Sequence, residues 1–183
     1  AYNEAYTKAL NAANAAKNST SHNYSATEVT ARNGYYLNPG NTTVGQSAAG
    51  DASLNLSLAN VRTTGSITIT KEDSETGAIA QGDATLSGAV YGLYARNNIV
   101  HPDGHTGILY TAGTLVATFP ATDENRQARL NNLYLGNYYV KEITPSTGYL
   151  LDTKEYDVAV TYEGQDVPNV VRTSTVSYTH LRA

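Results

Sequence analysis

Apolar and polar residues alternate over several short stretches of this 183-residue chain, and alternation of this kind is typical of half-buried β-strands. In the later part of the chain it predicts a strand over residues 66–71 (SITITK) and further strands over residues 88–95, 108–111, 115–119, 128–130, 138–143, 156–161 and 170–176. Residues 97–107 are polar, contain Pro102 and two glycines, and are interpreted as a loop. Many short strands separated by turn residues indicate a β-sandwich.

The first 62 residues are less regular. Residues 1–17 are rich in alanine and carry apolar residues at helical spacing, which predicts a short N-terminal helix. Alternation predicts strands over residues 24–30 and 53–61, and in the second of these Leu54, Leu56 and Leu58 share one face. Residues 18–23 and 42–51 are interpreted as loops, and residues 63–65 as a short linker.

A short motif occurs twice in the chain. TEVT at residues 27–30, followed by GYYLN at 34–38, is matched by KEIT at 141–144, followed by GYLLD at 148–152. The offset from Glu28 to Glu142 is 114 residues, and the offset from Gly34 to Gly148 is the same. This spacing favours two tandem domains of similar build, with residues 1–62 forming the C-terminal part of the first and residues 65–176 forming the second.

Two charged residues occur at strand positions whose neighbours on the same face are mainly apolar. In the strand at residues 66–71, Ile67, Ile69 and Lys71 point to one side, so the Lys71 amine is aimed at the core. The same parity puts Glu142 on the face of Tyr138 and Val140. A buried ammonium is costly unless it is paired, so we expect Lys71 and Glu142 to meet. The plainer alternative is that both charges lie at strand ends and reach water.

Composition excludes several classes of function. The net charge is −4 and only 15 % of residues are charged, so the clustered basic surface of a nucleic-acid-binding protein is absent. Cysteine is absent, which excludes disulfides, thiolate metal sites and cysteine nucleophiles. No run of 18 apolar residues predicts a membrane span, and the start of the chain lacks a signal peptide. We therefore expect an internal fragment whose export signal and anchor lie outside it.

The sequence contains only weak signals for a metal site or a catalytic site. His101, Asp103 and His105 lie in one polar loop, but their spacing does not fit a metal-binding helix face, and we expect an ordinary loop without a metal. No pairing of a nucleophile with a base stands out, and no phosphate-binding glycine loop is present. The sequence thus predicts a protein that is not an enzyme and needs no cofactor.

Several motifs of residues 65–176 occur in an order and spacing that resemble one known family. They are KED at 71–73 followed by Thr76-Gly77, LSGAVYGL at 86–93, LYLGNYYVKE at 133–142, and then Pro145 and Gly148-Tyr149. This part of the chain resembles a Cna B-type, or prealbumin-like, domain of Gram-positive pilins and adhesins, the SpaA-like group. The resemblance implies an all-β, seven-stranded Greek-key β-sandwich in a surface-exposed stalk.

The resemblance also implies a chemistry. In many members of the family, the lysine at the position of Lys71 forms an intramolecular isopeptide bond with an Asn or Asp of the last strand, assisted by the glutamate at the position of Glu142. A desolvated neutral amine is a nucleophile, and a nearby protonated carboxyl can move protons. The product constrains the unfolded chain much as a disulfide does. In the preceding domain, the equivalent residues are Glu28 and Asn60.

This chain departs from the family at the acceptor. Its last predicted strand continues as RTSTVSY at residues 172–178, which contains neither Asn nor Asp. The nearest candidates are Asn169 and Asp166, which lie earlier, and we expect no completed isopeptide bond. Residues 177–183 belong to a segment, VSYTHLRA, that resembles translated sequencing adapter, and we interpret them as a non-native tail; an ordinary strand with a basic end is the alternative.

These observations predict a structural stalk or repeat module of a bacterial surface adhesin or pilin, extracellular and attached to the cell wall. Its expected partners are neighbouring domains of the same surface protein. The alternative is a module whose loops at one end of the sandwich, residues 97–107 above all, bind a carbohydrate or a host extracellular protein.

Overall fold

The computed structural model describes residues 21–48 and 53–178, and all of its regular elements are β-strands. The helix predicted over residues 1–17 lies outside the described residues. The chain divides into two compact units. Unit 1 comprises Ala1–Arg62 with Gly164–Pro168, and unit 2 comprises Thr63–Glu163 with Asn169–Ala183. No helix long and apolar enough to cross a membrane occurs among the described residues.

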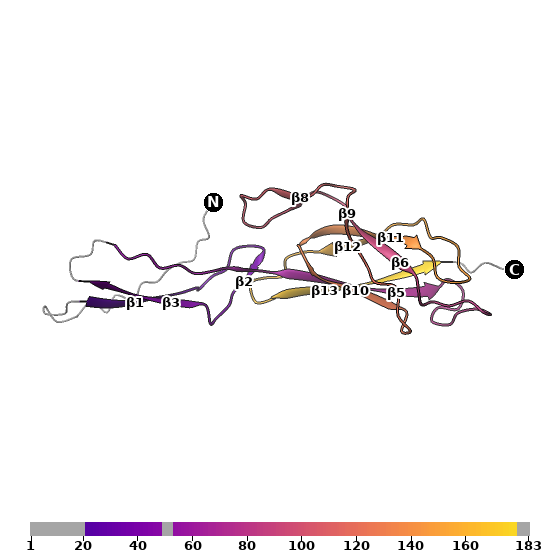
Figure 1. The fold of residues 1–183 in the computed structure, drawn as a ribbon, viewed down its shortest axis with the longest axis horizontal. Helices are drawn as coiled ribbons and strands as arrows, with labels where there is room; N and C mark the ends of the chain where they lie inside the picture. The colour runs from indigo at the N-terminus through magenta and orange to yellow at the C-terminus, as the bar shows by residue number, and fades with distance from the viewer. Residues whose placement is uncertain (1–20, 49–52, 179–183) are drawn as a thin grey trace. The chain divides into compact units, whose positions relative to one another are not determined.

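Unit 2 is a sandwich of two sheets, which confirms the all-β sandwich expected from the sequence (Figure 1). One sheet has the order β10-β5-β13 and the other the order β12-β11-β6-β9, while β7 and β8 form a separate hairpin. The strands are β5 (Thr64–Asp73), β6 (Val90–Ala95), β7 (Ile99–Val100), β8 (Ile108–Tyr110), β9 (Leu115–Thr118), β10 (Gln127–Leu133), β11 (Gly136–Thr144), β12 (Tyr156–Val160) and β13 (Asn169–Tyr178).

The core of unit 2 lies between these sheets and consists of inward-facing residues from alternate strand positions. Its fully buried apolar side chains include Ile67, Ile69, Tyr91, Leu93, Tyr138, Val140, Val160, Val170 and Val176. Gly65 admits the Val160 side chain, because a Cβ at residue 65 would lie 2.5 Å from Val160 Cγ1. Val90 in β6 and Leu135 just before β11 are apolar residues of this unit but are only half-buried. In β6 the side chains that face the core are those of Tyr91, Leu93 and Ala95, so the Val90 side chain lies on the opposite face of the strand.

The first and last strands of unit 2 lie side by side. β13 pairs with β5 in parallel over its whole length, from Asn169 opposite Thr64 to Tyr178 opposite Asp73. Along its other edge, β13 is joined to β12 by side chains rather than by a ladder. The Arg172 guanidinium donates to the Ala159 carbonyl at 2.9 Å, and the Tyr156 hydroxyl accepts from Ser177 N at 3.2 Å. These bonds close one side of the sandwich.

Unit 1 is built on the hairpin of β1 (Ser21–Thr27) and β3 (Thr42–Ala48), which pair antiparallel, and on a short pair formed by β2 (Tyr35–Tyr36) and β4 (Val61–Arg62). Residues 53–60 are extended, and their exposure alternates strictly. Leu54 and Leu56 pack on β3 at Gly45, where a Cβ would lie 2.5 Å from Leu56 Cδ2. Glycine at this position therefore permits the close approach of the leucine row.

Five sequence expectations about local structure were wrong. Residues 18–23 were expected to be loop, but β1 begins at Ser21, and residues 63–65 were expected to be a linker, but β5 begins at Thr64. Residues 42–51 were expected to be loop, but Thr42–Ala48 form β3, whose polar residues become a strand by pairing with β1. The loop expected over residues 97–107 contains β7, which pairs with β8. The strand expected over residues 53–61 forms no ladder with described residues before Val61, although its leucines alternate as expected. Ser177 and Tyr178 belong to β13, and residues 179–183 lie outside the described residues.

Unit 1 should open more readily than unit 2. Its leucine row stays half-exposed, whereas the equivalent inward residues of unit 2 are fully buried, and local opening is easiest where little apolar surface is buried. We expect the amides of β1 and β3 to exchange with deuterium faster than those of β5 and β11, as measured by hydrogen exchange on the full chain. Equal protection in the two units would contradict this expectation.

Candidate functional site

The core of unit 2 holds a buried ion pair. Lys71 lies on the inward face of β5 after Ile67 and Ile69, and Glu142 lies on the inward face of β11 after Tyr138 and Val140. The Lys71 Nζ atom is 2.9 Å from Glu142 Oε1, and both side chains are almost completely excluded from solvent. The contact expected from strand parity is therefore present. Burial on this scale makes each charge depend on the other, because neither reaches water.

The remaining polar atoms of the pair are also satisfied. Lys71 Nζ donates to the Tyr91 hydroxyl at 3.2 Å and lies 5.1 Å from the centre of the Tyr149 ring. Glu142 Oε2 accepts from the backbone N–H of Asp152 at 2.7 Å. A buried polar group that keeps its hydrogen bonds avoids most of the cost of burial. The pair thus has the shell of partners that lets two charges remain inside a core.

Two buried carboxylates flank the pair, and each contacts a tyrosine. Tyr149 donates to Asp73 Oδ2 at 2.9 Å, and Tyr156 lies 2.7 Å from Asp152 Oδ2. Burial, reinforced by these carboxylates, raises the pKa of Tyr149 and of Tyr156 to about 12. Burial opposes the charge of Asp73, but hydrogen bonds from the Glu75 and Thr76 amides, Gln81 and Tyr149 outweigh it and hold the Asp73 pKa well below its usual range.

Tyr91 completes the site. Its hydroxyl accepts a hydrogen bond from Lys71 Nζ. Burial, and after it the negative charge of Glu142, raises the pKa of Tyr91 far above its usual range. Tyr91 therefore stays neutral. The five residues around the pair, which are Asp73, Tyr91, Tyr149, Asp152 and Tyr156, were not singled out from the sequence. Two signals for them were available: Asp73, Tyr91 and Tyr149 occur in the family motifs, and Tyr149 and Asp152 occur in the repeated motif.

Neither of the acceptor candidates expected from the sequence, Asn169 and Asp166, lies beside the Lys71 amine. The residue of β13 in register with Lys71 is Val176, which is fully buried on the same side. Asn169 is the first residue of β13, pairs with Thr64, and donates through its side-chain amide to Ser66 Oγ at 3.2 Å. Seven strand positions separate it from Val176, or about 23 Å at the usual rise of a strand. Asp166 is exposed in the loop before β13. The structure brings neither candidate to Lys71.

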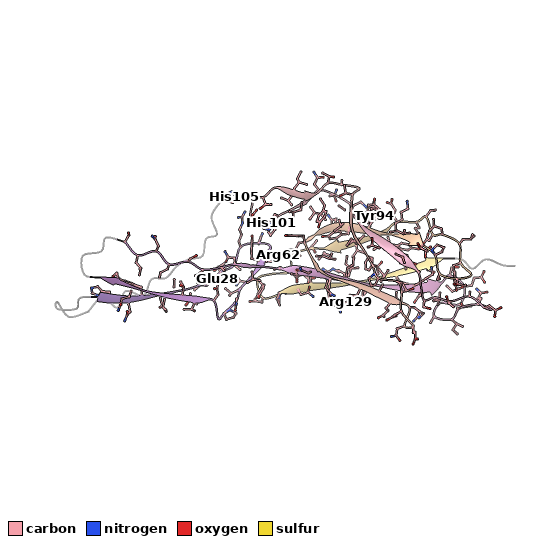
Figure 2. All side chains as sticks on the ribbon, in the orientation of Figure 1. Glu28, Arg62, Tyr94, His101, His105 and Arg129 are labelled. Atoms are coloured by element: carbon pink, nitrogen blue, oxygen red, sulfur yellow. The ribbon has the colours of Figure 1, made fainter. Side chains whose placement is uncertain are left out.

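Glu28 and Asn60, the equivalents expected in the preceding domain, both lie in unit 1. Glu28, which is labelled in Figure 2, follows β1. It is 4 % exposed. Its Oε2 atom accepts from the Asn41 side-chain amide at 3.3 Å, and the same amide donates to the Ala59 carbonyl at 2.8 Å. Asn60 is half-buried and shares the inward parity of the leucine row. Asn41 thus links Glu28 to the residue that precedes Asn60.

The loop that carries His101 and His105 is organised around Asp103. The Asp103 carboxylate accepts from the backbone amides of His105 and Thr106, each at 2.9 Å. Hydrogen bonds from Thr106 and the His105 amide hold the pKa of Asp103 well below its usual range. The carboxylate is therefore used in closing its own loop, and no group of three metal-ligating side chains gathers anywhere in the described part of the chain.

Comparison with known proteins identifies the fold of unit 2. Residues 65–174 match the SpaA family, described as a prealbumin-like fold domain. The chain belongs to this family. The match spans the sandwich from the start of β5 to the centre of β13, so the buried pair lies inside the SpaA domain. No curated protein matches the chain.

The chain is similar to several solved structures at low sequence identity. The Bacillus anthracis TIE protein matches with a TM-score of 0.62 at 22 % identity, covering 88 % of this chain and 25 % of that one. The group B streptococcus pilus 2b backbone protein matches at 0.48 and 19 % identity, covering 81 % and 53 %. BcpA, the major pilin subunit of Bacillus cereus, matches at 0.44 and 19 % identity, covering 88 % and 38 %. The chain thus spans between a quarter and about half of these proteins.

Breaking the pair should destabilise the SpaA domain strongly. Glu142→Ala leaves a buried ammonium without its counter-charge, and we expect the free energy of unfolding to fall by about 3–5 kcal/mol. The double variant Lys71→Met/Glu142→Leu removes both charges, and its free energy of unfolding should fall by less than that of the single variant. Glu124→Ala, at an exposed loop position, serves as the control and should change the free energy of unfolding by less than about 0.5 kcal/mol. Urea denaturation followed by circular dichroism measures all three, and a Glu142→Ala loss as small as that of the control would contradict the role of the pair.

Proposed function

We propose that this chain is a structural module of a bacterial cell-surface stalk, of the pilin or adhesin type, and that its SpaA domain carries tension along that stalk. The module is extracellular, belongs to a protein attached to the cell wall, performs no catalysis on outside substrates, and has neighbouring domains of the same surface protein as partners. Membership of the SpaA family and the resemblance to domains of Gram-positive pilins and adhesins support the setting. One geometric observation supports the mechanical role.

That observation is the parallel ladder between β5 and β13. The chain enters the domain at the start of β5 and leaves it at the end of β13, and the two strands run in the same direction in register over ten residues. Tension applied along the chain pulls these strands past each other. The rungs of the ladder are then loaded together, whereas pulling the strands apart from one end would load them one after another. A parallel first and last strand is the arrangement that resists pulling.

Single-molecule force spectroscopy tests this role. The chain has no cysteine, so an introduced cysteine defines the pulling point without ambiguity. We expect the domain to unfold at a clearly higher force when the chain is pulled by its two ends than when it is pulled by its N-terminal end and by Val171→Cys. Val171 is exposed and lies near the start of β13, so the second geometry unzips the ladder from one end. Equal forces in the two geometries would refute the mechanical proposal.

Within this function, we infer that Lys71 and Glu142 join the two sheets as an ion pair in place of an isopeptide bond. Amide formation would require the Lys71 nitrogen to attack a side-chain carbonyl carbon, with ammonia leaving an Asn or water leaving an Asp, while Glu142 carries the proton. The amine and the carboxyl are in contact and are shielded from water. The residue of β13 in register with the amine, Val176, has no carbonyl in its side chain.

Supplying that carbonyl should restore the chemistry. We expect Val176→Asn to yield a protein whose intact mass is about 17 daltons below the value calculated from its sequence, because ammonia is lost when the bond forms. The unsubstituted chain should show its full calculated mass, and Val176→Asn combined with Lys71→Met should do so as well. Intact-mass spectrometry distinguishes these results. A full-mass Val176→Asn protein would show that the pair lacks this reactivity, and a deficit in the unsubstituted chain would reveal another acceptor.

A further inference from the structure

The amino-acid composition makes tyrosine the side chain of this protein that oxidants attack most readily. Thiols, thioethers, indoles and phenols are the side-chain groups that oxidants usually attack in proteins. The chain contains no cysteine, no methionine and no tryptophan, but it contains 15 tyrosines. Of these four groups it therefore keeps the phenol alone. A one-electron oxidant that reaches this protein takes its electron from a tyrosine, and the position of that tyrosine decides what the radical does next.

Two tyrosines of the SpaA domain are stacked on each other. Tyr94 of β6 and Tyr139 of β11 are directly opposite in the antiparallel ladder and lie on the outer face of the four-stranded sheet. Their ring centres are 5.1 Å apart, and their ring planes differ by 13°. Both side chains are half-buried, and Tyr94 is labelled in Figure 2. The two phenols are therefore in contact with each other and within reach of a small reagent from solvent.

Neighbouring residues hold the two rings in this arrangement. The Arg96 guanidinium lies 4.1 Å from the centre of the Tyr139 ring, at a distance typical of a cation–π contact. Arg96 Nη1 is 2.8 Å from Glu155 Oε2, and its Nη2 is 2.6 Å from Asp157 Oδ1, so the guanidinium is itself fixed in place. The second ring of the pair covers Gly92, because a Cβ at residue 92 would lie 2.6 Å from its Cε2 atom. The stack is thus assembled before any oxidant arrives.

We propose that Tyr94 and Tyr139 are an oxidative cross-linking site, at which a haem peroxidase with hydrogen peroxide converts the two phenols into an intramolecular dityrosine. Each phenol gives one electron to the oxidant and its hydroxyl proton to water. The two tyrosyl radicals pair, and a carbon–carbon bond forms between ring carbons ortho to the hydroxyl groups. The hydrogen on each of these carbons then moves to the phenol oxygen. One hydrogen peroxide takes up the two electrons and two protons and becomes two waters.

Contact between the rings favours coupling within one molecule over coupling between molecules. Groups held together in the right geometry react as if their concentration were on the order of 10⁵ M or more, far above that of any second protein molecule in solution. The bond joins the neighbouring strands β6 and β11 at residues 94 and 139, and it closes a loop of the unfolded chain as a disulfide does. In a chain without cysteine, an oxidative covalent link of this kind does not depend on thiols.

Treatment of the full chain with a haem peroxidase and hydrogen peroxide, at low protein concentration, tests this site. We expect the intact mass of the monomer to fall by the mass of two hydrogen atoms, and peptide mapping to place the new bond between Tyr94 and Tyr139. Tyr94→Phe and Tyr139→Phe each keep a ring in the stack but remove a phenol. Each variant should lower the yield of cross-linked monomer by about tenfold or more, because the remaining tyrosines lose the advantage of contact.

Tyr110→Phe is the matched control, since Tyr110 is a half-buried tyrosine of β8, and it should leave the yield unchanged. Treatment of the unsubstituted chain in urea is a second control, because it keeps every tyrosine but removes the stack. There the cross-links should be distributed over many tyrosine pairs. A native monomer of unchanged mass, a bond that maps to other tyrosines, or products that are only covalent dimers or oxygen adducts would each overturn the proposal. An undiminished yield in Tyr94→Phe would overturn it as well.

Discussion

The burial of one lysine inside an apolar core is the constraint on which the rest of the SpaA domain depends. A 0 % exposed ammonium requires a counter-charge, further hydrogen-bond acceptors and an aromatic surround, and the two sheets must meet at a fixed register to provide them. Glu142 comes from the opposite sheet and Tyr91 from the strand beside it. The pair therefore specifies how the sheets face each other, which apolar packing alone leaves less defined.

The same geometry links stability to mechanics. Lys71 lies toward the end of β5, the strand that shares its full length with β13, so the ion pair ties the ladder proposed to carry tension to the second sheet. The Tyr156 hydroxyl and Arg172 then hold the free edge of β13 against β12. In this chain the position that faces the amine across the ladder is occupied by Val176, so the domain relies on packing and on the buried pair.

The two units offer an internal comparison. Each has a hairpin with a buried glutamate followed by an extended segment, but in unit 2 the glutamate meets a lysine and in the described part of unit 1 it meets an asparagine amide. Because the local motifs are so similar, the difference isolates what the β5 strand contributes. It supplies a ladder partner and a charge at once.

Local sequence determined the strands whose alternation was strong, the parity that aims Lys71 and Glu142 inward, and the family motifs around them, because strand periodicity decides which side chains share a face. It did not determine β3, whose Thr and Gln residues become a strand only through pairing with β1, nor the half-exposed position of Val90. Tertiary structure alone decided the parallel register that puts Val176 beside Lys71 and Asn169 at the far end of the ladder, and it alone assembled Tyr91, Tyr149 and Asp152 around the pair. Register between strands separated by about a hundred residues is set by how two sheets pack, and no local pattern encodes it.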